Sequence, residues 1–320
     1  MMRRSVRARP MKDHNIGSEV EGFSLDVCLG SGAHGSCYRA HKVRKTSEKI
    51  CVKLISDKEQ AENEMKIMMK LKELEVVPTF IFFKTFPHVS CLGMTLAYED
   101  NIQRFLEKLD GSVDRNGQVM ETGRFSDETL VRVLLQCVSA LQKIHSLRIV
   151  HMDLKPENLF VTTAKNHSRH VRVLIGDFGM ATRVELVDGN LRPESDQPKY
   201  DLRSMAHCSP KVLMGGFHGF AEDLHQLSYL ALRMAGFDFV REFTTEVSLI
   251  SFKVHLMHNM TKVLSEGTQW LAPLFKAISS HNPLNIDYVD VKKAVRALID
   301  KVSFNESLRL KKIGQSFHLE

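Results

Sequence analysis

The chain has 320 residues, 26% of them charged and 43% hydrophobic, a composition that is ordinary for a globular protein with one large core. Its net charge of +6 is modest and predicts charge spread over the surface. No apolar run approaches the roughly 20 residues that span a bilayer, so no membrane partner is expected. The six cysteines show no C-x-x-C or metal-ligand spacing, which argues against a disulfide framework and indicates a reducing, intracellular compartment, cytoplasmic or nuclear.

Residues 1 to about 20 differ from the rest of the chain. Four arginines and a lysine precede the first acidic residue, Asp13, and the segment has no apolar signal-peptide core. Three interpretations remain open: a disordered tail, a nuclear-targeting or nucleic-acid-binding patch, and a mitochondrial presequence. Binding to nucleic acid is therefore expected, if it occurs, only through this basic segment.

A glycine-rich run follows, in which Gly30, Gly32 and Gly35 have the spacing G-x-G-x-x-G. Glycine lets backbone N–H groups approach phosphates closely, because it has no Cβ. The spacing alone also suits a dinucleotide-binding fold, which needs a helix directly after it. Here the residues after Cys37 lead towards another strand, so we expect a β-hairpin that covers phosphates.

Residues 50–53 predict a strand that carries Lys53, which is unusual because buried lysine is rare without a partner. Residues 56–59 have the sequence of a capping box, so we expect a helix to begin there. Glu64 shares the inward face of this helix with apolar residues at i+3, i+4 and i+7, whereas Glu62 lies off that face. Two further strands are expected at 80–83 and 89–96.

After these strands comes a polar, glycine-containing stretch, 111–124, which predicts a loop insertion. Ser126 then predicts the N-cap of a helix that ends near His145. Residues 159–161 and 171–175 predict a hairpin.

The run His151-Met152-Asp153-Leu154-Lys155-Pro156-Glu157-Asn158 is followed by Asp177-Phe178-Gly179, and the predicted hairpin would place Asn158 beside Asp177. These residues supply carboxylates, an ammonium and an amide. That set can handle a hydroxyl nucleophile, a transferring phosphoryl group and magnesium, which prefers oxygen ligands.

This ordered series resembles the eukaryotic-type protein kinase family over about residues 23–310. The resemblance implies an α+β, two-lobed fold, with a small β-rich N-lobe at about 23–94 and a larger helical C-lobe at about 98–310. It also implies ATP and Mg²⁺ as cofactors and protein substrates phosphorylated on Ser or Thr, since Lys155 is the form seen in Ser/Thr-directed members. The family hinge, where adenine would bond the backbone, is expected at residues 95–97. The oligomeric state is not predicted.

By the same resemblance, Asp153 would orient the substrate hydroxyl and accept its proton, and Lys155 would neutralise charge on the γ-phosphate. Asn158 and Asp177 would hold magnesium, and Lys53, fixed by Glu64, would bind the α- and β-phosphates, with Glu62 as the alternative partner. Cys37, Cys51 and Phe160 match the positions that sandwich adenine, and Met94 matches the residue at the back of the pocket. The residues expected to contact ATP are Leu29, Gly30, Ser31, Gly32, Ala33, His34, Gly35, Ser36, Cys37, Cys51, Lys53, Met94, Leu96 and Phe160.

Residues 203–211 resemble the family's protein-substrate docking segment, and Asp223 resembles the helix residue that anchors the catalytic loop. Ser204 replaces the usual Thr, Lys211 replaces the usual Glu, and the stretch Asn282 to Ile286 lacks the Arg that normally pairs with that Glu. Losing both partners is tolerable, whereas losing one would leave a buried charge at a cost of about 3–5 kcal/mol.

Met152 replaces the usual Arg before the catalytic Asp, and Lys53 and Glu64 are unusually close in sequence. This spacing is similar to that of the casein-kinase-like and vaccinia-related kinases, and the divergent motifs are similar to those of kinases of large DNA viruses. Two other functions stay open. A pseudokinase or binding scaffold predicts loss of catalytic residues. A small-molecule kinase of the aminoglycoside or choline type predicts that the docking segment is missing.

Overall fold

A computed structural model of the chain describes residues 15–32, 34–97, 100–110, 123–163, 170–188, 190–193, 205–281, 285–299, 307–313 and 316–320. These residues form two compact units. Unit 1 contains the residues up to 65 together with Phe80–Leu96, and unit 2 contains Lys66–Thr79 and Ala97–Glu320. The division at Leu96 falls inside the predicted hinge, whereas Lys66–Thr79, expected in the N-lobe, belongs to unit 2. In the part of the chain that is described, no helix is both long enough and apolar enough to cross a membrane.

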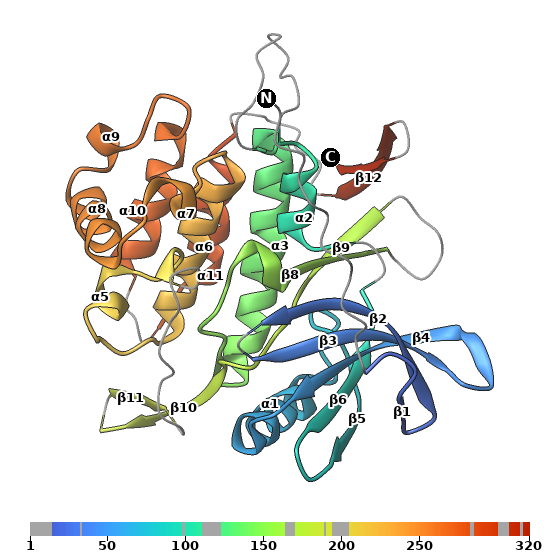
Figure 1. Ribbon diagram of the computed structural model, residues 1–320. Coiled ribbons are helices and arrows are strands. Elements are labelled where there is room, and N and C mark those ends of the chain that lie inside the picture. The colour runs from blue at the N-terminus through green and yellow to red at the C-terminus, as the bar shows by residue number, and fades with distance from the viewer. Residues whose placement is uncertain are drawn as a thin grey trace, which may run out of the picture. The chain divides into compact units, whose positions relative to one another are not determined.

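Unit 1 is built on an antiparallel sheet with the strand order β1-β2-β3-β4-β6-β5, drawn in blue to cyan in Figure 1. Side chains on one face of this sheet, among them Leu25, Tyr38, Ala40 and Val52, form a buried apolar cluster. The strands are β1 (Glu19–Val20), β2 (Phe23–Gly32), β3 (Gly35–Lys42), β4 (Lys45–Ile55), β5 (Phe80–Thr85) and β6 (Ser90–Thr95). The predicted disordered tail, 1 to about 20, is too long at its C-terminal end, because Glu19–Val20 form β1 and pair with β2. Residues 1–14 lie outside the described part.

Helix α1 (Lys58–Leu71) follows β4, close to where the capping box predicts a helix. The side chain that caps it is Asp57, whose Oδ1 accepts a hydrogen bond from the backbone N–H of Gln60 at 3.0 Å. The predicted start is therefore one residue early, because the carboxylate of Asp57 is the group that reaches the third helical N–H. The inward stripe is confirmed: the buried residues on it are Glu64, Ile67, Met68 and Leu71.

Helices α3 (Asp127–Ser146) and α6 (Phe220–Met234) form the centre of unit 2. The predicted Ser126 cap is confirmed, since its hydroxyl accepts from the backbone N–H of Thr129 at 3.3 Å. Helix α6 is buried nearly all round, as expected of a helix inside a core. The other helical elements are α2 (Ile102–Glu107), η1 (Pro156–Asn158), α5 (Pro210–Leu213), α7 (Phe239–Glu242), α8 (Glu246–His258), α9 (Met260–Val263), η2 (Gln269–Leu271), α10 (Ala272–Ser280) and α11 (Tyr288–Arg296).

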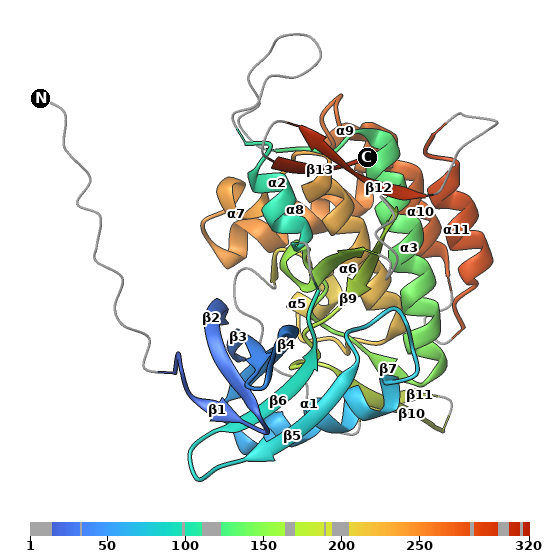
Figure 2. The same cartoon turned by 90° about the vertical axis from the view of Figure 1, so that its right-hand side faces the viewer.

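Unit 2 also contains small sheets with the orders β11-β10-β7 and β13-β12-β9-β8. The predicted hairpin after the catalytic run is present, with Leu159 opposite Ile175. Strand β12 pairs with β9, and Figure 2 shows the β12–β13 hairpin beside α2 and α3; this C-terminal hairpin was not predicted from the sequence. The strands are β7 (Ile149–Val150), β8 (Leu159–Thr163), β9 (His170–Ile175), β10 (Thr182–Val187), β11 (Asn190–Pro193), β12 (Leu308–Ile313) and β13 (Ser316–Leu319).

Candidate active site

A buried ion pair in unit 1 joins Lys53 of β4 to Glu64 of α1. The Nζ atom of Lys53 lies 2.9 Å from Oε1 and 2.7 Å from Oε2 of Glu64, and the two residues are 3% and 1% exposed. Glu62, the alternative partner, is exposed. The pairing chosen from the helix face is therefore the one present, because the stripe that buries apolar residues also turns Glu64 towards β4.

The glycine-rich run forms the predicted hairpin, in which β2 and β3 pair up to Gly32 opposite Gly35. Gly35 has φ +119°, and a Cβ there would overlap the carbonyl oxygen of Leu54, so no other residue fits without strain. Ser31 and Ser36 are hydrogen-bonded across the hairpin at 2.8 Å, and His34 contacts Gln60 of α1. Ala33 lies outside the described residues.

The residues expected around adenine belong to both units. In unit 1, β3 places Cys37 opposite Lys53, and β4 places Cys51 opposite Met94. Cys37 and Cys51 are partly exposed, whereas Met94 is buried. Phe160 lies in β8 of unit 2 and is partly exposed.

In unit 2 the catalytic run leaves β7 and turns sharply at Met152, which has φ +70°. Asp223 of α6 holds this turn, since its carboxylate accepts from the backbone N–H of His151 at 2.8 Å and of Met152 at 2.9 Å. The predicted anchoring contact of Asp223 is therefore present. Gln226, one turn along α6, accepts from the N–H of Leu154 and donates to the carbonyl of Met152, both at 2.8 Å.

Sequence reasoning missed Gln226 and two histidines that bind the same anchor. His145 and His218 each place Nε2 2.9 Å from a carboxylate oxygen of Asp223. Although burial would raise the pKa of Asp223, these hydrogen bonds and histidine charges hold it well below its usual range. Only the position of Gln226, three residues after Asp223 on a helix, could have suggested that both side chains share one face.

Asp153 lies at the centre of the run and is 2% exposed. Its Oδ2 accepts from Lys155 Nζ at 2.8 Å and from Asn158 Nδ2 at 3.1 Å. Its Oδ1 is buried and has no hydrogen-bond partner among the described residues. Burial alone would lower the pKa of Lys155, but the carboxylates of Asp153, Glu157 and Asp177 raise it, so Lys155 is a permanent cation here.

Asp177 follows β9, with φ +60°, and its Oδ1 accepts from the N–H of Gly179 at 3.4 Å. The N–H of Gly176 bonds the carbonyl of Asn158 at 2.9 Å, so the hairpin brings the two predicted magnesium ligands together. Asn158 donates through Nδ2 to Asp153, which leaves Oδ1 of the same amide for a cation.

Among the described residues no group of three or more His, Cys, Asp or Glu side chains is arranged to hold a metal. One carboxylate and one amide oxygen suit Mg²⁺, which keeps few protein ligands and takes phosphate oxygens as well.

Met152 packs into an apolar cluster with Val150, Met180 and Val184, against which Leu191 and two phenylalanines lie. The segment after Asp177 is therefore held near the catalytic run by apolar packing as far as β11. Thr182, one of the hydroxyls that could be phosphorylated in this segment, pairs with Val150 and is buried. Residues 194–204, including Ser204, lie outside the described part.

Lys211 of the predicted docking segment has a charged partner of its own. Its Nζ lies 3.0 Å from Oε1 of Glu222, and the hydroxyl of Ser209 donates to the other oxygen of the same carboxylate. Glu222 directly precedes the anchor Asp223, so α6 holds both the catalytic run and the end of the docking segment. The chain thus lacks the family's Glu–Arg pair and has the Lys211–Glu222 pair near the same place. Asn282 and Pro283, from the stretch that lacks the Arg, lie outside the described residues.

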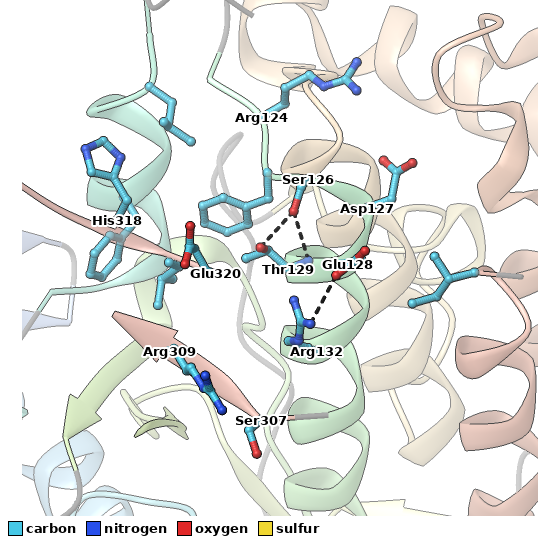
Figure 3. Close-up of a pocket in the computed structure, with 15 residues that line it drawn as sticks. Arg124, Ser126, Asp127, Glu128, Thr129, Arg132, Ser307, Arg309, His318 and Glu320 are labelled. Carbon is cyan, nitrogen blue, oxygen red and sulfur yellow. Dashed lines mark hydrogen bonds and ion pairs between the residues drawn. The ribbon is translucent and has the colours of Figure 1, made fainter. Parts of the chain in front are cut away.

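A cavity of about 780 Å³ in unit 2 lies beside the start of α3 (Figure 3). Its polar lining includes Arg124, Arg309 and Glu320, together with the Ser126–Thr129 and Arg132–Glu128 contacts drawn in Figure 3. None of the predicted catalytic, ATP-binding or magnesium residues lines it. The cavity is therefore separate from the candidate active site.

Comparisons with known proteins identify the family of the chain. A family model described as the protein kinase domain matches residues 23–294. Similar relatives include the serine/threonine-protein kinase PLK4 of Drosophila willistoni, which is 26% identical over 224 residues covering 68% of this chain and 25% of the relative. The carbon catabolite-derepressing protein kinase of Candida glabrata is 27% identical over 207 residues, which cover 64% of this chain and 30% of the relative. PLK4 of Danio rerio is 25% identical over 221 residues, which cover 67% of this chain and 21% of the relative.

The aligned part thus spans less than a third of the length of these relatives. The family match itself covers most of the chain and includes every predicted site residue. The chain belongs to the protein kinase domain family.

Proposed function

We propose that this protein is an ATP-dependent protein kinase that transfers the γ-phosphoryl group of ATP to Ser or Thr hydroxyls of protein substrates. The observation that carries the proposal is the state of Asp153: one carboxylate oxygen is held by Lys155 and Asn158, while the other is buried without a partner among the described residues. A buried acceptor without a donor is costly unless a ligand supplies one. A substrate hydroxyl would supply that donor and pass its proton to Asp153.

The other roles follow from the same geometry and from family membership. Magnesium-bound ATP, when present, supplies the phosphoryl group and an electrophilic phosphorus. Asn158 and Asp177 would hold the metal through oxygen atoms. Lys155 would offset charge on the transferring group, and Lys53, oriented by Glu64, would bind the α- and β-phosphates. The glycine-rich hairpin would cover those phosphates, with Gly35 at the position where a side chain cannot fit.

The alternative functions have less support. A binding scaffold without activity would be expected to lack one or more of Lys53, Asp153, Asn158 and Asp177, and all are present. A small-molecule kinase would not need residues 205–211, which here contact α6 and α8. The relatives named serine/threonine-protein kinases support the same hydroxyl class. None of the six cysteines, all of which lie in the described part of the chain, forms a disulfide, which supports a reducing compartment.

The test is a phosphotransfer assay with purified protein, Mg²⁺ and γ-labelled ATP on a panel of acidic, basic and proline-directed peptides, followed by identification of the labelled residue. We expect phosphoserine or phosphothreonine. Asp153→Asn should keep the fold and nucleotide binding but lower the rate by about 10²–10⁴-fold, the usual cost of losing a general base. Undiminished transfer by this variant, or label found only on aminoglycosides or choline added as competing acceptors, would refute the proposal.

A further inference from the structure

Helix α8 carries a lysine, Lys253, on its buried face. Lys253 is 0% exposed and lies between the buried residues Leu249 and Leu256 of the same face. Lysine is almost never fully buried unless its ammonium is satisfied, because the unpaired charge would be expensive. The partners of this ammonium therefore show what the residue does.

The Nζ atom of Lys253 donates to backbone carbonyls of the docking segment: to Met205 at 2.9 Å, Ala206 at 2.8 Å and Cys208 at 2.6 Å. It also lies 4.0 Å from the ring centre of Tyr229 and 5.4 Å from that of Phe239, within cation–π range. No ion pair among the described residues includes Lys253. An ammonium has three N–H donors, and here each has one carbonyl acceptor.

Carbonyl groups that converge on one point repel one another unless a donor or cation lies at that point. The backbone of residues 205–208 curves around Nζ, so its conformation depends on the lysine ammonium. An apolar side chain in the same place would leave three buried carbonyls unsatisfied, which native proteins avoid. Lys253 therefore determines the shape of the segment and does more than fill space.

The same segment is connected to the catalytic run. The Sγ of Cys208 lies 3.6 Å from Nε2 of Gln226, and Gln226 bonds the backbone on either side of Asp153, at Met152 and Leu154. A continuous set of contacts therefore leads from α8 through residues 205–208 and α6 to the proposed base.

We propose that Lys253 is a positioning residue that holds residues 205–208 in the shape on which the polypeptide substrate docks next to its phosphorylated hydroxyl. This inference rests on the proposed protein kinase function. Among the described residues no carboxylate neutralises the ammonium, and all three of its donors point at backbone carbonyls of the segment. The shape of this backbone therefore depends on the ammonium of Lys253.

The titratable groups packed around Lys253 come from the docking segment and from α6. Burial lowers the pKa of Lys253 to about 7, and burial together with nearby cations lowers the pKa of His207 well below its usual value. Burial raises the pKa of Cys208 to about 12 and moves that of Tyr229 well above its usual value. Of these groups, only Lys253 changes charge between about pH 6 and 9.

Four other charged side chains act on these groups: Lys155 and Arg233 on His207, and Asp153 and Glu222 on Cys208. A neutral Lys253 amine has two N–H donors and one lone pair, so one of the three carbonyls would lose its donor as the pH rises through about 7.

The test compares Lys253→Met, Lys253→Arg and the exposed control Lys262→Met, using the best peptide found in the phosphotransfer panel. Lys253→Met should raise the peptide KM by about tenfold or more, since buried carbonyls lose their donors, with an unchanged ATP KM. Lys253→Arg should restore much of the peptide affinity. The wild-type peptide KM should rise between pH 6 and 8.5, and that of Lys253→Arg should stay flat because guanidinium does not deprotonate.

A peptide KM for Lys253→Met equal to that of Lys262→Met would overturn the proposal. So would equal losses in kcat and in both KM values, which indicate general destabilisation. If Lys253→Met does not fold, Lys253→Arg and the wild-type pH profile decide, and a pH-independent peptide KM refutes the idea.

Amide hydrogen exchange of residues 205–208 needs no activity and separates the two proposals. If the wild type phosphorylates no peptide, the proposed function has failed. Faster exchange in Lys253→Met than in Lys262→Met would then still support the positioning of the segment, and equal exchange would refute it.

Discussion

Replacing Glu64 by Gln should weaken phosphotransfer while leaving the protein folded. Glu64 accepts two charge-assisted hydrogen bonds from Lys53, at 2.9 and 2.7 Å, and both residues are buried. Glutamine keeps one acceptor oxygen but turns an NH₂ group towards the ammonium, so one of the two bonds is lost. A hydrogen bond to a charged group contributes about 1.5–3 kcal/mol. At about 1.4 kcal/mol for each factor of ten, kcat/KM should fall by roughly 10–150-fold.

Lys53→Met should cost more activity, because it removes the group assigned to the phosphates. It also leaves the Glu64 carboxylate buried and alone, and breaking a buried pair in this way costs about 3–5 kcal/mol of stability. The assays are kcat/KM for ATP and urea unfolding followed by circular dichroism. Glu62→Gln is the matched control, since it makes the same change at an exposed position of the same helix. If Glu64→Gln is silent, or if Glu62→Gln is equally damaging, the assignment of the ion pair to catalysis is wrong.

The other predictions concern activation, nucleotide binding and pH. Protein made in bacteria and treated with phosphatase should remain active, because Met152 lies in an apolar cluster and offers a phosphate no donor. Mass spectrometry monitors the phosphorylation of residues 177–210, and activity that returns only when these residues are rephosphorylated would contradict the prediction. ATP should slow alkylation of Cys37 and Cys51, and equal rates with and without ATP would remove them from the adenine site. Because burial lowers the pKa of Lys253 to about 7, the unfolded chain binds more protons than the folded one above that pH. The free energy of unfolding of the wild type should therefore rise between about pH 7 and 10, by up to about 1.4 kcal/mol per pH unit relative to that of Lys253→Met. Urea unfolding of both proteins across this pH range measures the difference. The same pH dependence in both proteins would refute a buried charge at Lys253.

Much of the candidate site could be predicted because its residues lie close together in sequence or share one regular element. Asp153, Lys155 and Asn158 lie within a few residues of one another. The β8–β9 hairpin, whose two strands follow one another in the sequence, brings Asp177 close to them. Glu64 could be chosen over Glu62 because helical periodicity relates each residue to an apolar stripe. The Ser126 cap is equally local, since its hydroxyl bonds an N–H three residues away.

Contacts between distant segments were beyond such reasoning. The partner of Lys211 is Glu222, and the carbonyls around Lys253 come from a segment more than forty residues earlier in the chain. Nothing in the sequence near either lysine marks its partner, because which side chains meet depends on how α5, α6 and α8 pack. The cap of α1 was missed for a smaller reason: Ser56 and Asp57 are both good caps, and only the backbone path decides between them.

The sequence by itself determined the family, the order of the catalytic groups and the inward face of α1, because these depend on spacing along one strand, helix or loop. The tertiary structure alone decided what holds those groups in place. Asp223 and Gln226 fix the catalytic run, apolar packing surrounds Met152, and Lys253 shapes the docking segment. Each of these contacts joins residues far apart in the chain, and their free energy exists only once the helices of unit 2 have packed and excluded water.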